Sequence, residues 1–65
     1  MIARTNRSYM RRVANGYRLS AEYHEYKARM ASAEGDTRDA MMDRQRACEY
    51  RKRARQLEVE LEDAA

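Results

Sequence analysis

The sequence predicts an all-α protein: an antiparallel two-helix hairpin packed along an Ala-rich coiled-coil seam. Three observations support this prediction. The chain of 65 residues contains no Pro and is rich in Ala and Met, which favour helices. Ala recurs at every seventh position in each half of the chain. One strong turn signal, at residues 34–36, lies near the middle.

The turn signal sets the bounds of the two helices. Gly35 suits the left-handed position that follows a helix, and Asp36 suits the N-cap of the next one. Asp39 stands three residues after Asp36, as in a capping box. We therefore predict one domain over residues 1–65, with a helix at about 6–33, a turn at 34–36 and a helix at about 37–63.

Asn15-Gly16 is a second turn signal, and it lies inside the first predicted helix. Gly in a helix interior costs about 1 kcal/mol relative to Ala. Because the heptad pattern continues through Gly16 in phase, we expect a continuous helix in which Gly16 permits a kink or a close approach. The alternative is a break there, which would give three helical segments.

A heptad repeat predicts which faces of the helices meet, because seam residues alternate in steps of three and four. In the first segment they are Met10, Ala14, Tyr17, Ala21, His24, Ala28 and Ala31. In the second they are Ala40, Asp43, Ala47, Tyr50, Ala54, Leu57, Leu61 and Ala64. Small residues at every seventh position allow two helix backbones to approach closely.

A bend at Gly35 also predicts the register, because facing residues of an antiparallel hairpin have numbers with a constant sum. Three pairs of Ala share one sum: Ala28 with Ala40, Ala21 with Ala47, and Ala14 with Ala54. Between these layers the register places three further pairs: Tyr17 near Tyr50, His24 near Asp43, and Met10 near Leu57.

The charges favour the same orientation, although the net charge is only +3. Basic residues begin the first helix and acidic residues end the second, and each group opposes the dipole of its own helix. In a hairpin the two ends lie together, so the charges compensate. The basic group is Arg4, Arg7, Arg11 and Arg12, and the acidic group is Glu58, Glu60, Glu62 and Asp63.

Several classes of function find no support in the sequence. The single Cys48 cannot form an internal disulfide, and no Cys/His cluster has metal-binding spacing. His24 and Asp43 lack a nucleophile or a third partner, so they favour a polar contact in the seam over catalysis. We expect no enzyme, cofactor, metal or small-molecule substrate. The chain has neither a signal peptide nor an apolar run of transmembrane length, which favours a cytoplasmic protein without a membrane partner.

The apolar residues beside the seam predict a protein partner, since a lone hairpin cannot cover them and exposed apolar patches mark interfaces. The candidate interface residues are Tyr9, Leu19, Tyr23, Tyr26, Met30, Met41 and Met42. The partner is a second copy, giving a homodimeric four-helix bundle, or a larger host complex, or both. The alternative is that the chain folds only when its partner binds, because so short a chain buries little surface by itself.

A run of basic residues predicts an alternative function, in which a helical hairpin dimer binds RNA or DNA through a basic belt. The candidate residues are Arg44, Arg51, Lys52, Arg53 and Arg55. Interleaved Tyr residues can stack on bases. Against this, a helical charge run is commonly a solvated face, and no known nucleic-acid-binding motif is present.

The hairpin layout and heptad spacing resemble those of the plasmid repressor-of-primer proteins, which are helical hairpins that dimerise into four-helix bundles and bind RNA. The resemblance stops at the layout, and no shared motif transfers RNA-binding residues to this chain. In its small size and its Ala- and Arg-rich composition the chain also resembles phage or mobile-element accessory proteins, including anti-CRISPR inhibitors. That likeness implies binding to, and inhibition or modulation of, a larger host complex.

Overall fold

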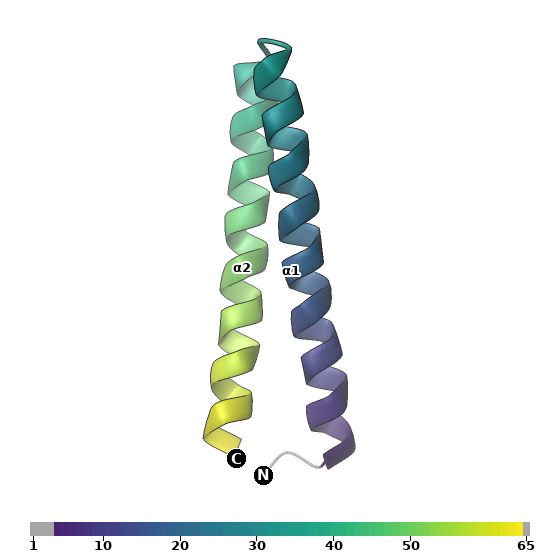
Figure 1. Cartoon of the computed structure of the whole chain (residues 1–65). Helices are drawn as coiled ribbons and strands as arrows, with labels where there is room; N and C mark the ends of the chain where they lie inside the picture. Colours follow the sequence, from purple (N-terminus) through teal and green to yellow (C-terminus); the bar gives the residue numbers. More distant parts are fainter. Residues whose placement is uncertain (1–3, 65) are drawn as a thin grey trace.

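The structure, a computed structural model, is an antiparallel hairpin of two helices (Figure 1). Helix α1 spans Arg4–Ala33 and helix α2 spans Thr37–Ala64. The structure describes residues 4–64, and the side chains of residues 6–63, so the predicted roles of the Arg4 and Ala64 side chains lie outside it. The predicted all-α hairpin is confirmed.

The turn between the helices forms as the sequence predicts. Gly35 has a φ of 84°, in the left-handed region that L side chains rarely adopt. The backbone N–H of Asp36 donates to the carbonyl of Ala31 at 2.9 Å, and that of Gly35 donates to Ser32 at 3.0 Å. These two bonds make a Schellman motif, which satisfies carbonyls at the end of α1.

The N-terminus of α2 is capped by Asp36. Its Oδ1 accepts a hydrogen bond from the backbone N–H of Asp39 at 3.1 Å, as the capping pattern predicts. Its carbonyl accepts the first helical bond, from Ala40 at 3.1 Å. Gly35 and Asp36 together therefore end one helix and start the next within three residues.

Helix α1 runs without a break through Asn15-Gly16, so the alternative of three helical segments is wrong. A Cβ added at Gly16 would meet nothing within 4 Å. Within the hairpin, therefore, no close approach of backbone or side chain requires glycine at this position.

The core between the helices is built from six Ala residues. Ala14, Ala21, Ala28, Ala40, Ala47 and Ala54 are at most 4% exposed. The predicted polar and aromatic layers lie between them: Tyr17 stacks on Tyr50 with ring centroids 5.9 Å apart, and His24 meets Asp43. Since these contacts have the numbering that a bend at Gly35 dictates, the predicted register is confirmed.

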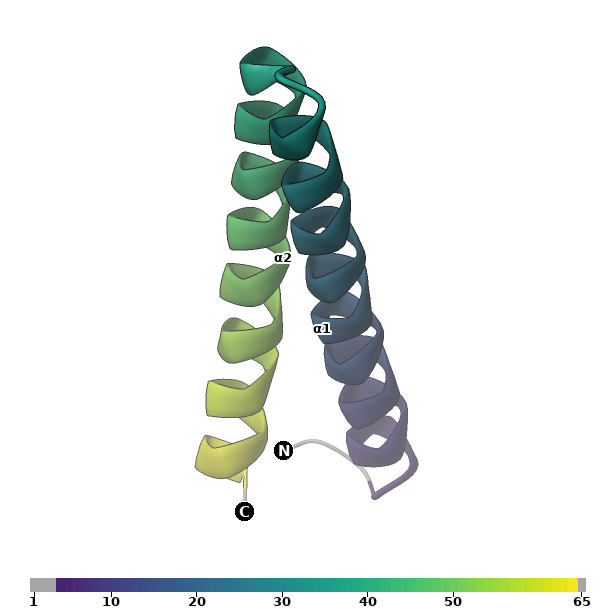
Figure 2. The same cartoon turned by 45° about the horizontal axis from the view of Figure 1, so that its top comes forward.

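The hairpin is long and narrow, with extents of 48 × 14 × 10 Å. The two ribbons lie closest near the turn and separate towards the termini, as both views show (Figures 1 and 2). The sequence gives a reason for this shape. Only Ala faces Ala next to the turn, whereas larger side chains such as Met10, Tyr17 and Leu57 enter the seam towards the open end.

Two ion pairs join the helices along one edge of the seam. Arg18 Nε donates to Glu58 Oε1 at 2.7 Å, and Arg51 pairs with Glu25. Glu58 belongs to the predicted acidic group, but its partner Arg18 lies outside the predicted basic group at the start of α1. The side chains are one-third to one-half exposed, and such pairs contribute about 0.2–1 kcal/mol each.

Candidate functional site

Many of the large apolar side chains of the chain lie on its surface, while the fully buried core consists of Ala. Tyr9, Leu19, Tyr23, Tyr26 and Met30 are all on α1, and their exposed fractions run from 48% to 64%. Exposed apolar patches on a protein surface commonly mark interaction sites. The surface of α1 that faces away from the seam is therefore the first candidate for a functional site.

These residues belong to a second heptad stripe on α1. Steps of three and four connect eight exposed positions, which we call the outer stripe: Tyr9, Arg12, Gly16, Leu19, Tyr23, Tyr26, Met30 and Ala33. At about 100° per residue, the line between Tyr23 and Tyr26 points about 160° away from the line between Ala21 and His24. Helix α1 thus carries one seam towards α2 and a second, unoccupied one almost opposite.

Helix α2 has no comparable stripe. Its outer face, at equivalent positions, consists of Arg38, Met42, Gln45, Glu49, Lys52, Gln56, Val59 and Asp63, all exposed. Only Met42 and Val59 are apolar. The exposed apolar surface of the hairpin is therefore concentrated on α1.

The two Met residues predicted in α2 lie in different places. Met42 shares a surface groove of about 390 Å³ with Met30, beside the turn, so it adjoins one end of the outer stripe. Met41 is 60% exposed but does not line that groove. Adjacent helical residues point about 100° apart, which directs Met41 away from Met42. The structure therefore places five of the seven predicted interface residues on the outer surface of α1, Met42 on α2 beside one end of it, and Met41 apart from both.

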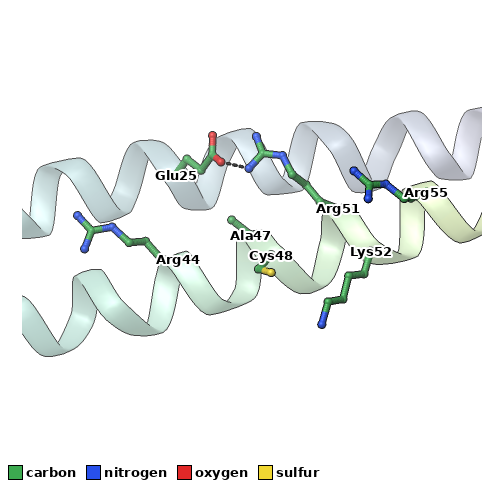
Figure 3. Close-up of a pocket in the computed structure, with 7 residues that line it drawn as sticks. All are labelled: Glu25, Arg44, Ala47, Cys48, Arg51, Lys52 and Arg55. Atoms are coloured by element: carbon green, nitrogen blue, oxygen red, sulfur yellow. Dashed lines mark ion pairs between the residues drawn. The ribbon is translucent and has the colours of Figure 1, made fainter.

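The second candidate site is a groove of about 380 Å³, which we call the basic groove (Figure 3). Four of the five basic residues predicted for nucleic-acid binding line it, together with one acid and two small residues. The lining residues are Arg44, Arg51, Lys52 and Arg55, with Glu25, Ala47 and Cys48. Glu25 comes from α1 and forms the ion pair with Arg51. The other three cations have no such partner within the groove, so the groove carries excess positive charge.

The fifth predicted residue, Arg53, lies elsewhere. Its guanidinium stands over the rings of Tyr17 and Tyr50, at 5.9 Å and 5.8 Å from their centroids. A cation over an aromatic face is a stabilising contact within the hairpin. Arg53 therefore makes contacts within the hairpin, and the other four predicted residues line the basic groove.

A polar and aromatic cluster occupies the middle of the seam. Nδ1 of His24 and Oδ1 of Asp43 are joined by a hydrogen bond of 2.9 Å, and Asp43 is 7% exposed. The imidazole also stacks on Tyr50, with centroids 5.5 Å apart and planes at 12°. The ammonium of Lys27 lies 3.8 Å from the same carboxylate oxygen and 5.5 Å from the Tyr23 ring.

The environment of Asp43 lowers the pKa of its carboxyl group. The hydrogen bond with His24 is the main cause, and the positive charge of Lys27 acts in the same direction, while burial opposes both. The neighbours of this pair are Tyr and Lys side chains already engaged in stacking and charge contacts. The arrangement suits a polar layer that fixes the register of the two helices.

Two patterns in the sequence correspond to these sites but do not appear among the predictions above. Arg44, Cys48, Arg51 and Arg55 follow steps of four, three and four, which place them on one helical stripe. The outer stripe likewise becomes a heptad only when Arg12 and Gly16 are counted in it. Neither pattern is visible in the consecutive run 51–55 or in the apolar residues alone, because both depend on helical spacing.

Other kinds of site find no counterpart in the described part of the chain. Residues 4–64 contain no group of His, Cys, Asp and Glu side chains placed to hold a metal ion. Neither described helix is long and apolar enough to cross a membrane. Comparisons with models of known protein families, with curated proteins and with solved structures find no match to this chain.

Proposed function

We propose that the protein is a non-enzymatic helical interaction module, which binds another protein through the outer stripe of α1. The observation that carries the proposal is the inverted placement of apolar residues. Ala fills the core, whereas Tyr23, Tyr26 and Leu19 are each more than half exposed. Tyr and Met are enriched in the buried centres of protein interfaces, where their large surfaces leave water.

Binding through this face would change how a larger complex assembles, without catalysing a reaction. A hairpin 48 Å long can lay most of α1 into a groove of a larger complex and thereby block or stabilise it. The basic groove and the basic start of α1 would speed and orient the encounter with an acidic surface. A phage or mobile-element accessory protein that inhibits or modulates a host complex, as anti-CRISPR inhibitors do, is one form of this function.

The experiment compares two double variants with the wild type. Tyr23→Ser with Tyr26→Ser removes the centre of the outer stripe. Gln45→Ser with Gln56→Ser is the control, because it changes two exposed residues of the outer face of α2 that do not line the basic groove. Complexes are captured quantitatively from an extract of the source cell, and association is measured again with the purified components. We expect loss of association in the Tyr variant alone. Equal association of both variants and the wild type would show that the outer stripe is not the binding surface.

Nucleic-acid binding is the second candidate function, and the basic groove is the observation that favours it. Four cations gather within three helical turns of α2, against the single carboxylate of Glu25. Phosphate contacts release counterions, so affinity would fall steeply with salt. Labelled single-stranded RNA and duplex DNA at two salt concentrations provide the test.

The matched comparison for this test uses two pairs of charge-neutralising changes. Arg44→Gln with Arg55→Gln removes charge from the basic groove, and Arg38→Gln with Arg46→Gln removes the same charge elsewhere on α2. Weaker binding and a shallower salt slope in the first pair alone would support the groove. Equal effects of both pairs would show that binding depends on net charge and not on the groove. Absence of binding at low salt would exclude nucleic-acid binding as the function.

A further inference from the structure

We propose that the outer stripe of α1 binds a second copy of the chain, with the two α1 helices parallel and in register. This inference rests on the proposed function, because it assigns an occupant to the same surface. The stripe continues for eight positions with coiled-coil spacing, which is the pattern that a partner helix recognises. In this arrangement each stripe residue lies opposite its own counterpart.

The placement of the stripe favours helix-to-helix pairing over a compact bundle. A four-helix bundle needs apolar residues of both helices on one side of the hairpin. Here the outer stripe points almost directly away from α2, and the outer face of α2 is mostly polar. The dimer inferred from this geometry is a row of four helices with the two α1 helices in the middle, which differs from the bundle expected from the sequence.

The charges flanking the stripe determine the direction of the second copy. In a parallel, in-register pair, each residue on the edge that holds Glu22 and Arg29 faces the residue five positions later, on the opposite edge, of the other copy. Glu22 then faces Lys27 of the second copy, and Arg29 faces Glu34. By symmetry each pair forms twice, which gives four attractive contacts.

An antiparallel pairing satisfies these charges less well. The arrangement that brings Glu22 to Arg29 of the second copy also brings Lys27 to its own counterpart. A shift of one heptad places Glu22 opposite Glu22. Like charges at such positions are destabilising, so the flanking residues select the parallel arrangement.

The hairpin leaves three of these four flanking charges available, whereas Lys27 also lies 3.8 Å from the carboxylate of Asp43 within the hairpin. Glu22, Arg29 and Glu34 are exposed, and none forms an ion pair within the described part of the chain. The charges that flank the inner seam, by contrast, are paired between the helices, as Arg18 with Glu58 and Glu25 with Arg51. Lys27 is 43% exposed and lies at the border of both seams.

Gly16 has a role in this dimer that the hairpin does not supply. It lies within the outer stripe, and the space around it is open to 4 Å. Opposite its own counterpart, it would let the two α1 backbones approach closely, as small residues do in helix pairs. Arg12 is the one charged residue of the stripe, and it lies near the N-terminal end, where a long side chain can reach solvent.

The available area predicts a weak dimer. Five large side chains, each about half exposed, would together remove roughly 1,000 Å² from water across both copies, which is near the lower limit for a specific interface. We therefore expect association in the micromolar range, visible in a concentration series.

The experiment measures sedimentation equilibrium of the full chain and of charge variants. Arg29→Glu and Glu34→Arg each create two repulsive contacts per dimer, so each variant alone should associate about tenfold more weakly. An equimolar mixture of the two restores both contacts and should recover association as a heterodimer. Arg38→Glu, on the outer face of α2, is the control for the change in charge, and circular dichroism checks that each variant keeps its helicity.

A cysteine variant tests the alignment independently. In a Cys48→Ser background, Leu19→Cys should form an intermolecular disulfide rapidly under mild oxidation, because residue 19 faces its counterpart in the parallel dimer. Gln45→Cys, on the outer face of α2, is the control and should form this link slowly.

Three results would overturn the inference. The wild type could stay monomeric at every concentration, the two charge variants could match Arg38→Glu, or their mixture could fail to recover association. The wild type could also stay monomeric while its complexes from the cell extract still depend on Tyr23 and Tyr26. That result would overturn the proposed self-association but would leave the proposed interaction function standing.

Discussion

At the scale of single residues, the hairpin depends on Ala where most proteins place large apolar side chains. Ala21 and Ala54 are completely buried, and Ala47 is 2% exposed. A methyl group at these positions contributes little transfer free energy, but it sets how near the helices lie. The core is therefore more sensitive to added volume than to lost volume.

Ala47→Leu tests this sensitivity. The added carbons must force the helices apart or strain nearby side chains, and overpacking of this kind costs about 1–3 kcal/mol. We expect a lower midpoint of urea unfolding, followed by circular dichroism at a fixed protein concentration. Gln45→Leu adds apolar volume at an exposed position of the same helix and should change the midpoint little. Similar losses in both variants would argue against a close-packed Ala seam.

Asp43 predicts how stability depends on pH. The pKa of its carboxyl is lowered in the folded chain, chiefly by the hydrogen bond with His24, so the unfolded state binds the proton more readily. Its contribution is therefore present above the unfolded pKa, about 3.9, and is lost as the pH falls through the lower folded pKa. Thermal unfolding from pH 6 to pH 2 should show a smaller acid loss for Asp43→Asn than for the wild type. Parallel curves would remove this residue as a cause.

At the scale of the elements, the two glycines of the chain have opposite roles. Gly35 adopts a φ of 84° to close α1, while Gly16 lies in the interior of that helix with open space around it. Only Gly35 is required by the backbone of the hairpin. Gly16 lowers the helix propensity of α1, and no packing contact within the hairpin compensates for this cost.

Substitution of each glycine by Ala should therefore change stability in opposite directions. Gly35→Ala places a Cβ in a left-handed conformation and should destabilise the hairpin by about 1–2 kcal/mol. Gly16→Ala should stabilise it by roughly 0.5–1 kcal/mol. Thermal unfolding at low protein concentration, where self-association is negligible, is the measurement. A loss of stability in Gly16→Ala would mean that α1 needs flexibility at this point.

The cap of α2 offers a separate test of the turn. Asp36→Ala removes the acceptor for the N–H of Asp39 and should cost about 1 kcal/mol. Asp36→Asn keeps an acceptor and should retain most of the stability, since Asn is an equally good N-cap. Equal losses in the two variants, measured by urea unfolding, would assign the effect to the charge of Asp36 and not to its hydrogen bond.

At the scale of the whole molecule, an ion pair between the helices favours their antiparallel orientation. Arg18 and Glu58 meet across the open half of the hairpin, and both side chains are substantially exposed. Reversal of one charge should destabilise the hairpin by about 0.2–1 kcal/mol, and reversal of both, Arg18→Glu with Glu58→Arg, should restore most of that loss. A double-mutant cycle by thermal unfolding, repeated at high salt, measures the coupling. A coupling free energy of zero at low salt would show that this ion pair does not contribute to the orientation of the helices.

The sequence was sufficient for the fold because its local signals agree with one another. Gly35 and Asp36 fix the turn, and the recurrence of Ala at every seventh position then fixes the register, so the pairs of Tyr17 with Tyr50 and His24 with Asp43 followed directly. Side-chain directions around α2 were harder to predict. Arg53 and Arg55 are close in sequence, yet one stacks on the seam tyrosines and the other lines the basic groove, because helical residues two apart point in nearly opposite directions.

The polar outer face of α2 has a consequence for how large any assembly can grow. A hairpin with an apolar seam on the outer face of each helix could associate through both faces and form open-ended fibres. In this hairpin the outer stripe of α1 is largely apolar, whereas the outer face of α2, with Gln45, Glu49 and Lys52, is mostly polar. A dimer formed through α1, as proposed above, would therefore present only the mostly polar outer faces of α2 and would offer no second seam for further copies.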